Sequence, residues 1–250
     1  MLQELKLAPR WVRRQHSSGE AAPSGEAALS GDAASSGAEP ETRAAKELRV
    51  TPVQDGADAA RLEHIASLSL AELAADVADC TACRLCRSRK LAVPGVGDPD
   101  ADWLFVGEAP GAEEDARGEP FVGQSGRLLD NMLLALGLSR ERQVYITNVL
   151  KCRPPNNRTP EPAEALACQP YLSRQIELIA PRIIVALGKS AATLLLGEES
   201  SIASLRGRVH RYRDVPLIVT YHPAYLLRSL PDKAKAWEDL LLAKRVVAAV

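Results

Sequence analysis

Residues 103–111 read WLFVGEAPG and decide the fold class. The run 103–106 is short, apolar and rich in aromatic and β-branched residues, which is typical of a buried strand. Two glycines and a proline follow in 107–111, and they permit a tight turn and a close approach of the backbone to a ligand. The segment lacks the Gly-Lys-Ser/Thr ending of a phosphate-binding loop. We therefore expect a strand whose carboxyl end presents Glu108 to a ligand site.

The same pattern recurs along the chain. Further strands are predicted at 144–147, 183–187 and 217–220, and helices at 69–79, 124–136, 161–179, 189–196 and 235–248. Alternation of strands and helices predicts an α/β fold, a three-layer α/β/α sandwich with a central, mostly parallel four-stranded sheet. Functional residues of such sheets gather at the carboxyl ends of the strands. These ends lead into Glu108, Asn148, Gly188 and His222.

Composition and charge place the protein among soluble globular proteins. Hydrophobic residues make up 46% and charged residues 25% of the 250 residues. No apolar run is long enough to span a membrane, and the N-terminus does not resemble a secretory signal, so we expect a cytoplasmic protein. The net charge of −1 conceals an asymmetry, because residues 1–79 carry −5 and residues 80–250 carry +4. The mildly basic part is compatible with a nucleic-acid partner.

The N-terminal part differs from the rest in composition. Residues 17–60 are rich in Ala, Gly, Ser and Glu and have few large apolar residues. We predict a disordered tail over residues 1–68 and a globular domain over 69–250, which begins with the capping-box pattern Ser69–Glu72. The basic piece 10–14 contacts DNA or a partner, or is a solvated terminus; both interpretations stay open.

Five cysteines, an odd number in a protein expected to be cytoplasmic, favour metal ligands over disulfides. Cys80 and Cys83 form a Cys-x-x-Cys pair, and Cys152 and Cys168 follow much later. Together they would make a four-thiolate site that suits either zinc or an iron–sulfur cluster. In the alternative, Cys168 is a small core residue. Cys86 is left over and is expected to be a free thiol.

Polar side chains at two strand ends suggest recognition of a nucleobase. Asn148 ends a strand, where Asn is uncommon, and its amide matches the N3–H and O4 edge of uracil. An Asx turn is the alternative. His222 is followed by Leu226, Leu227 and Arg228, an apolar wedge with a cation that suits insertion into a duplex.

Two further charged segments have two interpretations each. The acidic run 113–115 lies near Phe121 in sequence, and it either helps to hold a base and polarise a water or forms a solvated acidic turn. The segment 206–213 carries four arginines in eight residues. It either contacts phosphates or is an edge strand protected by charge.

Taken together, these motifs resemble the family 4 uracil-DNA glycosylases, the iron–sulfur branch of the uracil-DNA glycosylase superfamily. The motifs that carry the resemblance lie between about Cys80 and Val246, in the family's order: GEAPGAEED, EPFVGQSGRLL, YITNVLKCRPPNNR, the later Cys168, VALGKSAATLLLG and HPAYLLR. Each motif is weak alone, whereas the whole set in order is specific.

The resemblance implies roles for individual residues. It favours a structural [4Fe–4S] cluster over zinc, with the ligands Cys80, Cys83, Cys152 and Cys168. It implies a uracil pocket lined by Glu108, Ala109, Pro110, Phe121, Asn148 and His222. In that pocket Phe121 stacks on the base, Asn148 reads its edge and His222 faces O2. Glu108 is the favoured group for placing the attacking water, and Asn157 and Glu114 match polar positions near it. The loop that enters the duplex corresponds to Leu226, Leu227 and Arg228.

The implied function is hydrolysis of the N-glycosidic bond of flipped uracil in DNA, which leaves an abasic site for base excision repair. The implied partner is uracil-containing DNA, double- or single-stranded. The family expectation is a monomer, and the tail could bind a repair or replication partner. One alternative is a non-catalytic or covalent uracil-DNA-binding protein, although the segment 153–158 contains no histidine and no insertion. The others are a redox or regulatory iron–sulfur protein and a zinc-stabilised nucleic-acid-binding module.

Overall fold

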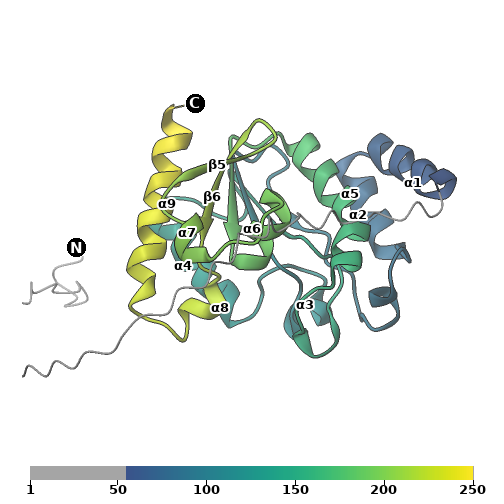
Figure 1. Cartoon of the computed structure of the whole chain (residues 1–250), viewed down its shortest axis with the longest axis horizontal. Coiled ribbons are helices and arrows are strands. Elements are labelled where there is room, and N and C mark those ends of the chain that lie inside the picture. The colour runs from purple at the N-terminus through teal and green to yellow at the C-terminus, as the bar shows by residue number, and fades with distance from the viewer. Residues whose placement is uncertain (1–54, 250) are drawn as a thin grey trace, which may run out of the picture. The chain divides into compact units, whose positions relative to one another are not determined.

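The computed structural model describes residues 55–249 (Figure 1). Its strands are β1 (Val96–Gly97), β2 (Trp103–Gly107), β3 (Val144–Asn148), β4 (Ile183–Leu187), β5 (Val209–Tyr212) and β6 (Val215–Thr220). Its α-helices are α1 (Asp55–Ser67), α2 (Leu70–Asp79), α3 (Ala112–Arg117), α4 (Gln124–Leu136), α5 (Pro162–Ile179), α6 (Lys189–Leu196), α7 (Ile202–Leu205), α8 (Pro223–Leu226) and α9 (Asp232–Ala249). Short 3-10 turns cover Arg84–Arg87 and Pro155–Asn157.

The sheet has the strand order β1-β3-β2-β4-β6-β5. The four inner strands are parallel, and both edge strands pair antiparallel to their neighbours. The α/β class and the mostly parallel sheet are confirmed, but the predicted number of four strands is wrong. The missed strand β1 has only two residues, too few for a periodic pattern. Strand β5 alternates between exposed and half-buried residues, so it carries no apolar run and was absent from the predicted four; an edge strand was one of the two interpretations of its segment. The arginine-rich segment therefore includes a charged edge strand.

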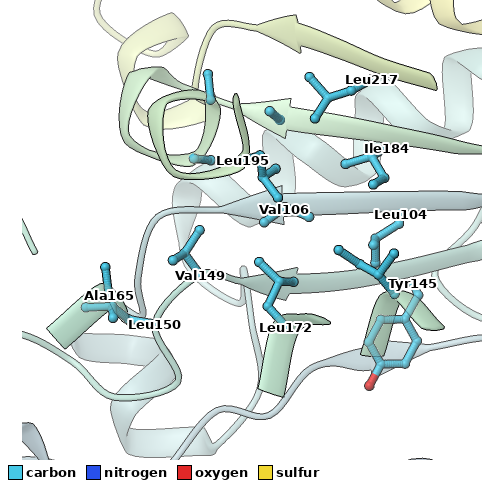
Figure 2. Packing of buried hydrophobic residues seen from close by; sticks show 14 of the residues in the cluster. Leu104, Val106, Tyr145, Val149, Leu150, Ala165, Leu172, Ile184, Leu195 and Leu217 are labelled. Carbon is cyan, nitrogen blue, oxygen red and sulfur yellow. The ribbon is translucent and has the colours of Figure 1, made fainter. Parts of the chain in front are cut away.

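Apolar side chains pack on both faces of the sheet and make three layers. On one face, alternate residues of the strands meet helices α5 and α6, as Figure 2 shows for Leu104 and Val106 against Leu172 and Leu195. On the other face, Trp103, Phe105 and the alternate residues of the neighbouring strands pack against α4 and α9. All residues of β2, β3 and β4 are buried, which is the pattern of parallel strands covered on both sides. The rigid sheet fixes where each strand ends.

The N-terminal boundary differs from the prediction, because α1 lies in the segment that was predicted to be a tail. Ile65 is only 2% exposed and packs in a cluster with Leu73, Val77 and Tyr171. The helix has few large apolar residues, so its sequence resembles the preceding low-complexity segment. The predicted capping box of α2 is confirmed, since Ser69 and Glu72 each bond the other's backbone N–H. Residues 1–54 of the predicted tail, including the basic piece 10–14, lie outside the described residues.

A membrane-spanning segment was not expected from the sequence. Among residues 55–249, no helix combines the length and the apolar character that a bilayer span needs.

Candidate active site and cysteine-lined cavity

A cavity of about 510 Å³ opens at the carboxyl edge of the sheet, where β2, β3 and β6 end. Its lining residues are Glu108, Ala109, Pro110, Gly111, Glu114, Phe121, Ser125, Asn148, Pro154, Asn157, Arg158, His222, Ala224 and Arg228. The structure thus brings together the residues predicted from three separate strand ends. The volume of the cavity is within the range of small-molecule sites.

Asn148 lies at the floor of this cavity and is only 2% exposed. Its side-chain oxygen Oδ1 is fully buried and accepts no hydrogen bond from any described residue. An Asx turn would require Oδ1 to accept a backbone N–H, so that alternative is wrong. A buried acceptor without a donor costs about 1–3 kcal/mol. The orphaned oxygen therefore fits a ligand that carries an N–H donor.

Gly107 makes room for this amide. A Cβ atom at position 107 would lie 2.3 Å from Asn148 Oδ1 and 2.7 Å from the ring of Phe121. Both distances are far below normal contact, so any side chain here would displace the amide or the ring. The glycine at the end of β2 is thus required by the cavity itself.

Phe121 forms one wall of the cavity in a left-handed backbone conformation (φ 54°). Its ring centroid lies 5.5 Å from that of His222. Arg140 donates hydrogen bonds to the carbonyl oxygens of Pro120 and Phe121, at 2.8 and 2.5 Å. No local pattern marks this role of Arg140, because it lies about 20 residues from its partners, in an ordinary polar turn.

His222 caps α8, and its Nδ1 atom accepts the N–H of Ala224 at 3.1 Å. Nδ1 therefore lacks a hydrogen, and in the neutral ring Nε2 carries it. Burial lowers the pKa of His222 to about 4, against a smaller opposing effect of the Glu114 charge. The histidine is thus a neutral hydrogen-bond donor at physiological pH.

Glu114 is buried, and its carboxylate accepts three backbone N–H groups, from Gly111 at 3.1 Å, Val122 at 3.0 Å and Gly123 at 3.2 Å. It ties the turn after β2 to the segment that carries Phe121. Asp115 is buried too and accepts the N–H of Lys90. The solvated acidic turn is therefore the wrong interpretation for these two residues. Both oxygens of Glu114 accept backbone N–H groups, so this carboxylate positions the two segments relative to each other.

Replacing Glu114 by Gln places an NH₂ donor opposite one of these backbone donors. We expect Glu114→Gln to lower kcat about 10-fold or more by letting the cavity walls move. Steady-state turnover by this variant and by Glu113→Gln, an exposed neighbour, checks the prediction. Equal rates for both variants and the unmodified protein would contradict it.

The remaining predicted site residues divide into two groups: the cavity is lined by Glu108, Ala109, Pro110, Asn157 and Arg228, but not by Leu226 and Leu227. The Glu108 carboxylate is half-buried and has no hydrogen-bond or ion-pair partner among the described side chains. Asn157 accepts a hydrogen bond from Arg153 at 2.7 Å. Leu227 is 40% exposed, whereas Leu226 is 1% exposed. Leu226 is therefore part of the core, and only Leu227 and Arg228 of the predicted wedge reach the surface.

All five cysteines line a second, small cavity of about 20 Å³ beside α2 and α5. Arg89 donates to Cys152 Sγ at 3.0 Å, and the backbone N–H of Lys151 donates to Cys168 Sγ at 3.3 Å. Within residues 58–249, no group of three or more His, Cys, Asp or Glu side chains has metal-binding geometry as placed. The cysteines are nevertheless gathered at one place, as the sequence predicted.

The electrostatics of this cavity follow from its burial. Burial raises the pKa of Cys83 and Cys152, and it raises that of Cys168 to about 12. Thiolates would therefore need a bound cation to form here. Burial also lowers the pKa of Lys151 to about 7. Three oxygen acceptors around its Nζ atom favour the charged ammonium.

Comparison with known proteins identifies the family of the chain. Residues 94–241 match the family model of the uracil DNA glycosylase superfamily. The chain is 49% identical over 180 residues to the type-4 uracil-DNA glycosylase of Sulfurisphaera tokodaii, covering 68% of this chain and 81% of that protein. It is 47% identical over 167 residues to the type-4 enzyme of Archaeoglobus fulgidus, covering 64% and 83%. A type-5 enzyme of Thermus thermophilus is 37% identical over 135 residues, covering 48% and 59%.

The chain belongs to the uracil DNA glycosylase superfamily. Within that superfamily, it is a member of the type-4 uracil-DNA glycosylases.

Proposed function

We propose that the protein hydrolyses the N-glycosidic bond of uracil in DNA and leaves an abasic site, the first step of base excision repair. The observation that carries the proposal is the buried, unpartnered Oδ1 of Asn148 at the floor of the cavity. The type-4 relatives bear the name of this activity.

Recognition of the base follows from the cavity floor and wall. Asn148 Oδ1 would accept the N3–H of a flipped uracil, and its amide NH₂ would donate to O4. Cytosine has no hydrogen on N3, so it would leave the orphaned oxygen unsatisfied. The ring of Phe121 would stack on the base. Gly107 leaves room for the amide and the ring to take these positions.

Bond cleavage leaves positive character on the sugar and negative charge on the departing uracil. The neutral His222 would donate Nε2–H to O2 and stabilise that charge as it develops. A water must attack C1′ from the other side of the sugar. Glu108, which has a free carboxylate, and Asn157 at the rim would hold and orient this water.

A pH profile tests the state of His222. Because its pKa lies near 4, kcat/KM should show no imidazole titration between about pH 6 and pH 8. The unfolded state, with the ordinary pKa of about 6.5, binds the proton first, so His222 lowers stability as the pH falls from about 6.5 to 4. Profiles of kcat/KM and of thermal unfolding for the unmodified protein and His222→Gln check both points. A rate step near pH 6.5 that vanishes in the variant would contradict them.

The surface loop after β6, which carries Leu227 and Arg228, would contact the duplex. Leu227 and Arg228 are proposed to enter the space left by the flipped nucleotide. Asp232 braces this loop by accepting from Tyr225 Oη and Ser229 Oγ, both at 2.7 Å. Leu226 supports it from the core.

The proposed cofactor is a structural [4Fe–4S] cluster held by Cys80, Cys83, Cys152 and Cys168. The donor set fits, because thiolates are the usual ligands of such clusters. Two N–H···S hydrogen bonds and the cations of Arg89 and Lys151 would offset the negative charge of the thiolates. The cluster would cross-link α2, the segment after β3 and α5, and hydrolysis needs no electron transfer. Cys86 would stay a free thiol.

The protein is further proposed to act as a cytoplasmic monomer, as its sequence and its resemblance to the family imply. Its substrate would be uracil in double- or single-stranded DNA. Residues 1–54 are the candidate segment for a repair or replication partner.

A strand-cleavage assay tests the proposal. A labelled oligonucleotide with one uracil is incubated with the protein and heated in alkali, and an identical thymine oligonucleotide is the control. Cleavage at uracil alone is the expected result. If neither oligonucleotide is cleaved, the proposal is overturned. A DNA adduct that survives denaturation would indicate the alternative, a covalent uracil-DNA-binding protein.

A further inference from the structure

We infer that Lys151 is a positioning residue that holds the base-reading amide of Asn148 in place and joins it to the cysteine-lined cavity. The inference rests on the proposed function, because it concerns the same pocket. Lys151 does not line that pocket and was not among the predicted site residues.

The Lys151 side chain is only 1% exposed, and its ammonium group has three oxygen acceptors. Nζ donates to Thr147 Oγ1 at 2.6 Å, to the backbone oxygen of Asn148 at 2.8 Å and to Gln175 Oε1 at 2.6 Å. Thr147 and Gln175 in turn donate to the backbone oxygen of Pro94, at 2.9 and 2.7 Å. All three ammonium hydrogens are therefore used, and the buried polar network is closed.

The orientation of the Asn148 amide needs such support, because its oxygen makes no hydrogen bond within the described residues. Its Oδ1 has no partner among the described residues, so no hydrogen bond of this oxygen fixes the amide plane. The main chain must fix it instead. After β3 the N–H groups of Val149 and Leu150 donate to the backbone oxygens of Gly107 and Glu108, both at 3.0 Å. Lys151 holds the remaining group, the carbonyl of Asn148.

The other side of Lys151 reaches the cysteines. Its backbone N–H donates to Cys168 Sγ, and the next residue is Cys152. Its backbone oxygen accepts the N–H of Val93 at 2.8 Å. One residue thus makes contacts in both places, since its backbone N–H meets Cys168 Sγ and its Nζ meets the Asn148 carbonyl. A displacement at the cysteines therefore reaches Asn148 through Lys151. The cysteine centre would therefore influence the pocket by positioning Asn148, without taking part in the reaction.

The test compares Lys151→Met with Gln175→Met. Both variants remove one member of the buried network at similar volume, but Gln175→Met leaves the bond from Lys151 to the Asn148 carbonyl. We expect Lys151→Met to lower kcat about 10- to 100-fold and to raise the Ki for free uracil to a similar extent, while KM for DNA changes less than about threefold. Gln175→Met should keep kcat and Ki within about threefold. Iron content and thermal unfolding are measured for both.

A purely structural role would move unfolding temperature and activity together in both variants. If the two variants lose equal stability and equal kcat, or if Lys151→Met keeps the uracil Ki, the inference is overturned. If Lys151→Met does not fold, Lys151→Gln decides, because its side chain is one atom shorter and withdraws the donor from the Asn148 carbonyl while it keeps a polar group in the buried network. A severalfold rise in uracil Ki supports the inference, and an unchanged Ki overturns it. An unmodified protein that spares uracil-DNA would instead overturn the proposed function.

Discussion

Asn148→Ala is expected to lower kcat for uracil excision by about 10²- to 10³-fold without lowering thermal stability. The variant loses both hydrogen bonds to the uracil edge. It also removes a buried acceptor that has no partner in the free protein. Leaving such an acceptor unsatisfied costs about 1–3 kcal/mol, so stability should hold or rise while activity falls. Single-turnover excision and thermal unfolding of the same preparation measure the two effects.

Thr193→Ala is the matched control for this prediction. Thr193 Oγ1 is the other buried side-chain atom without a partner in the described part of the chain, and it lies on α6, away from the cavity lining. This variant should likewise keep its stability, and its excision rate should not change. A slow Asn148→Ala that is also unstable would mean that the amide serves the fold. A fast one would remove Asn148 from the pocket.

Cys152→Ala is expected to lose bound iron and to accumulate as insoluble protein. Binding free energy of a structural metal centre is folding free energy, so a missing ligand costs stability directly. Cys152 joins the segment after β3 to the other cysteines, and Arg89 contacts its sulfur. Iron per protein, visible absorbance and the soluble fraction measure the effect.

Cys86→Ala is the control, because Cys86 lines the same cavity but is not a proposed ligand. It should retain iron, solubility and activity. A stable Cys152→Ala with full iron would remove Cys152 from the ligand set. Loss of iron in Cys86→Ala would place that thiol in the set instead.

The inner sheet was predictable from the sequence because buried parallel strands are short apolar runs with clear ends. The four inner strands lie within about two residues of the predicted bounds. Strand β1 was not predictable, since it has only two residues, and β5 was predicted only as one of two interpretations of the arginine-rich segment. Helix α1 was missed because the burial of Ile65 depends on Tyr171, which lies far along the chain.

The candidate site was predictable where a polar residue ends a strand, as Asn148 and His222 do. The supporting residues were not predictable, because their contacts join distant segments. Arg140 reaches the backbone of Phe121, and Lys151 reaches Gln175, with no local pattern to mark either contact. Leu226 shows that a motif can also predict too much. The resemblance placed it in the loop that enters the duplex, whereas its side chain is buried in the core.

Release of free uracil over several turnovers distinguishes a glycosylase from a protein that only binds uracil-DNA. The protein is incubated with an excess of uracil-containing duplex, and the free base is quantified by chromatography, along with DNA that stays bound after denaturation. We expect several uracil molecules to be released per protein molecule and no DNA to be retained. Release of no more than one uracil per protein, or retention of DNA in a stable adduct, would contradict it.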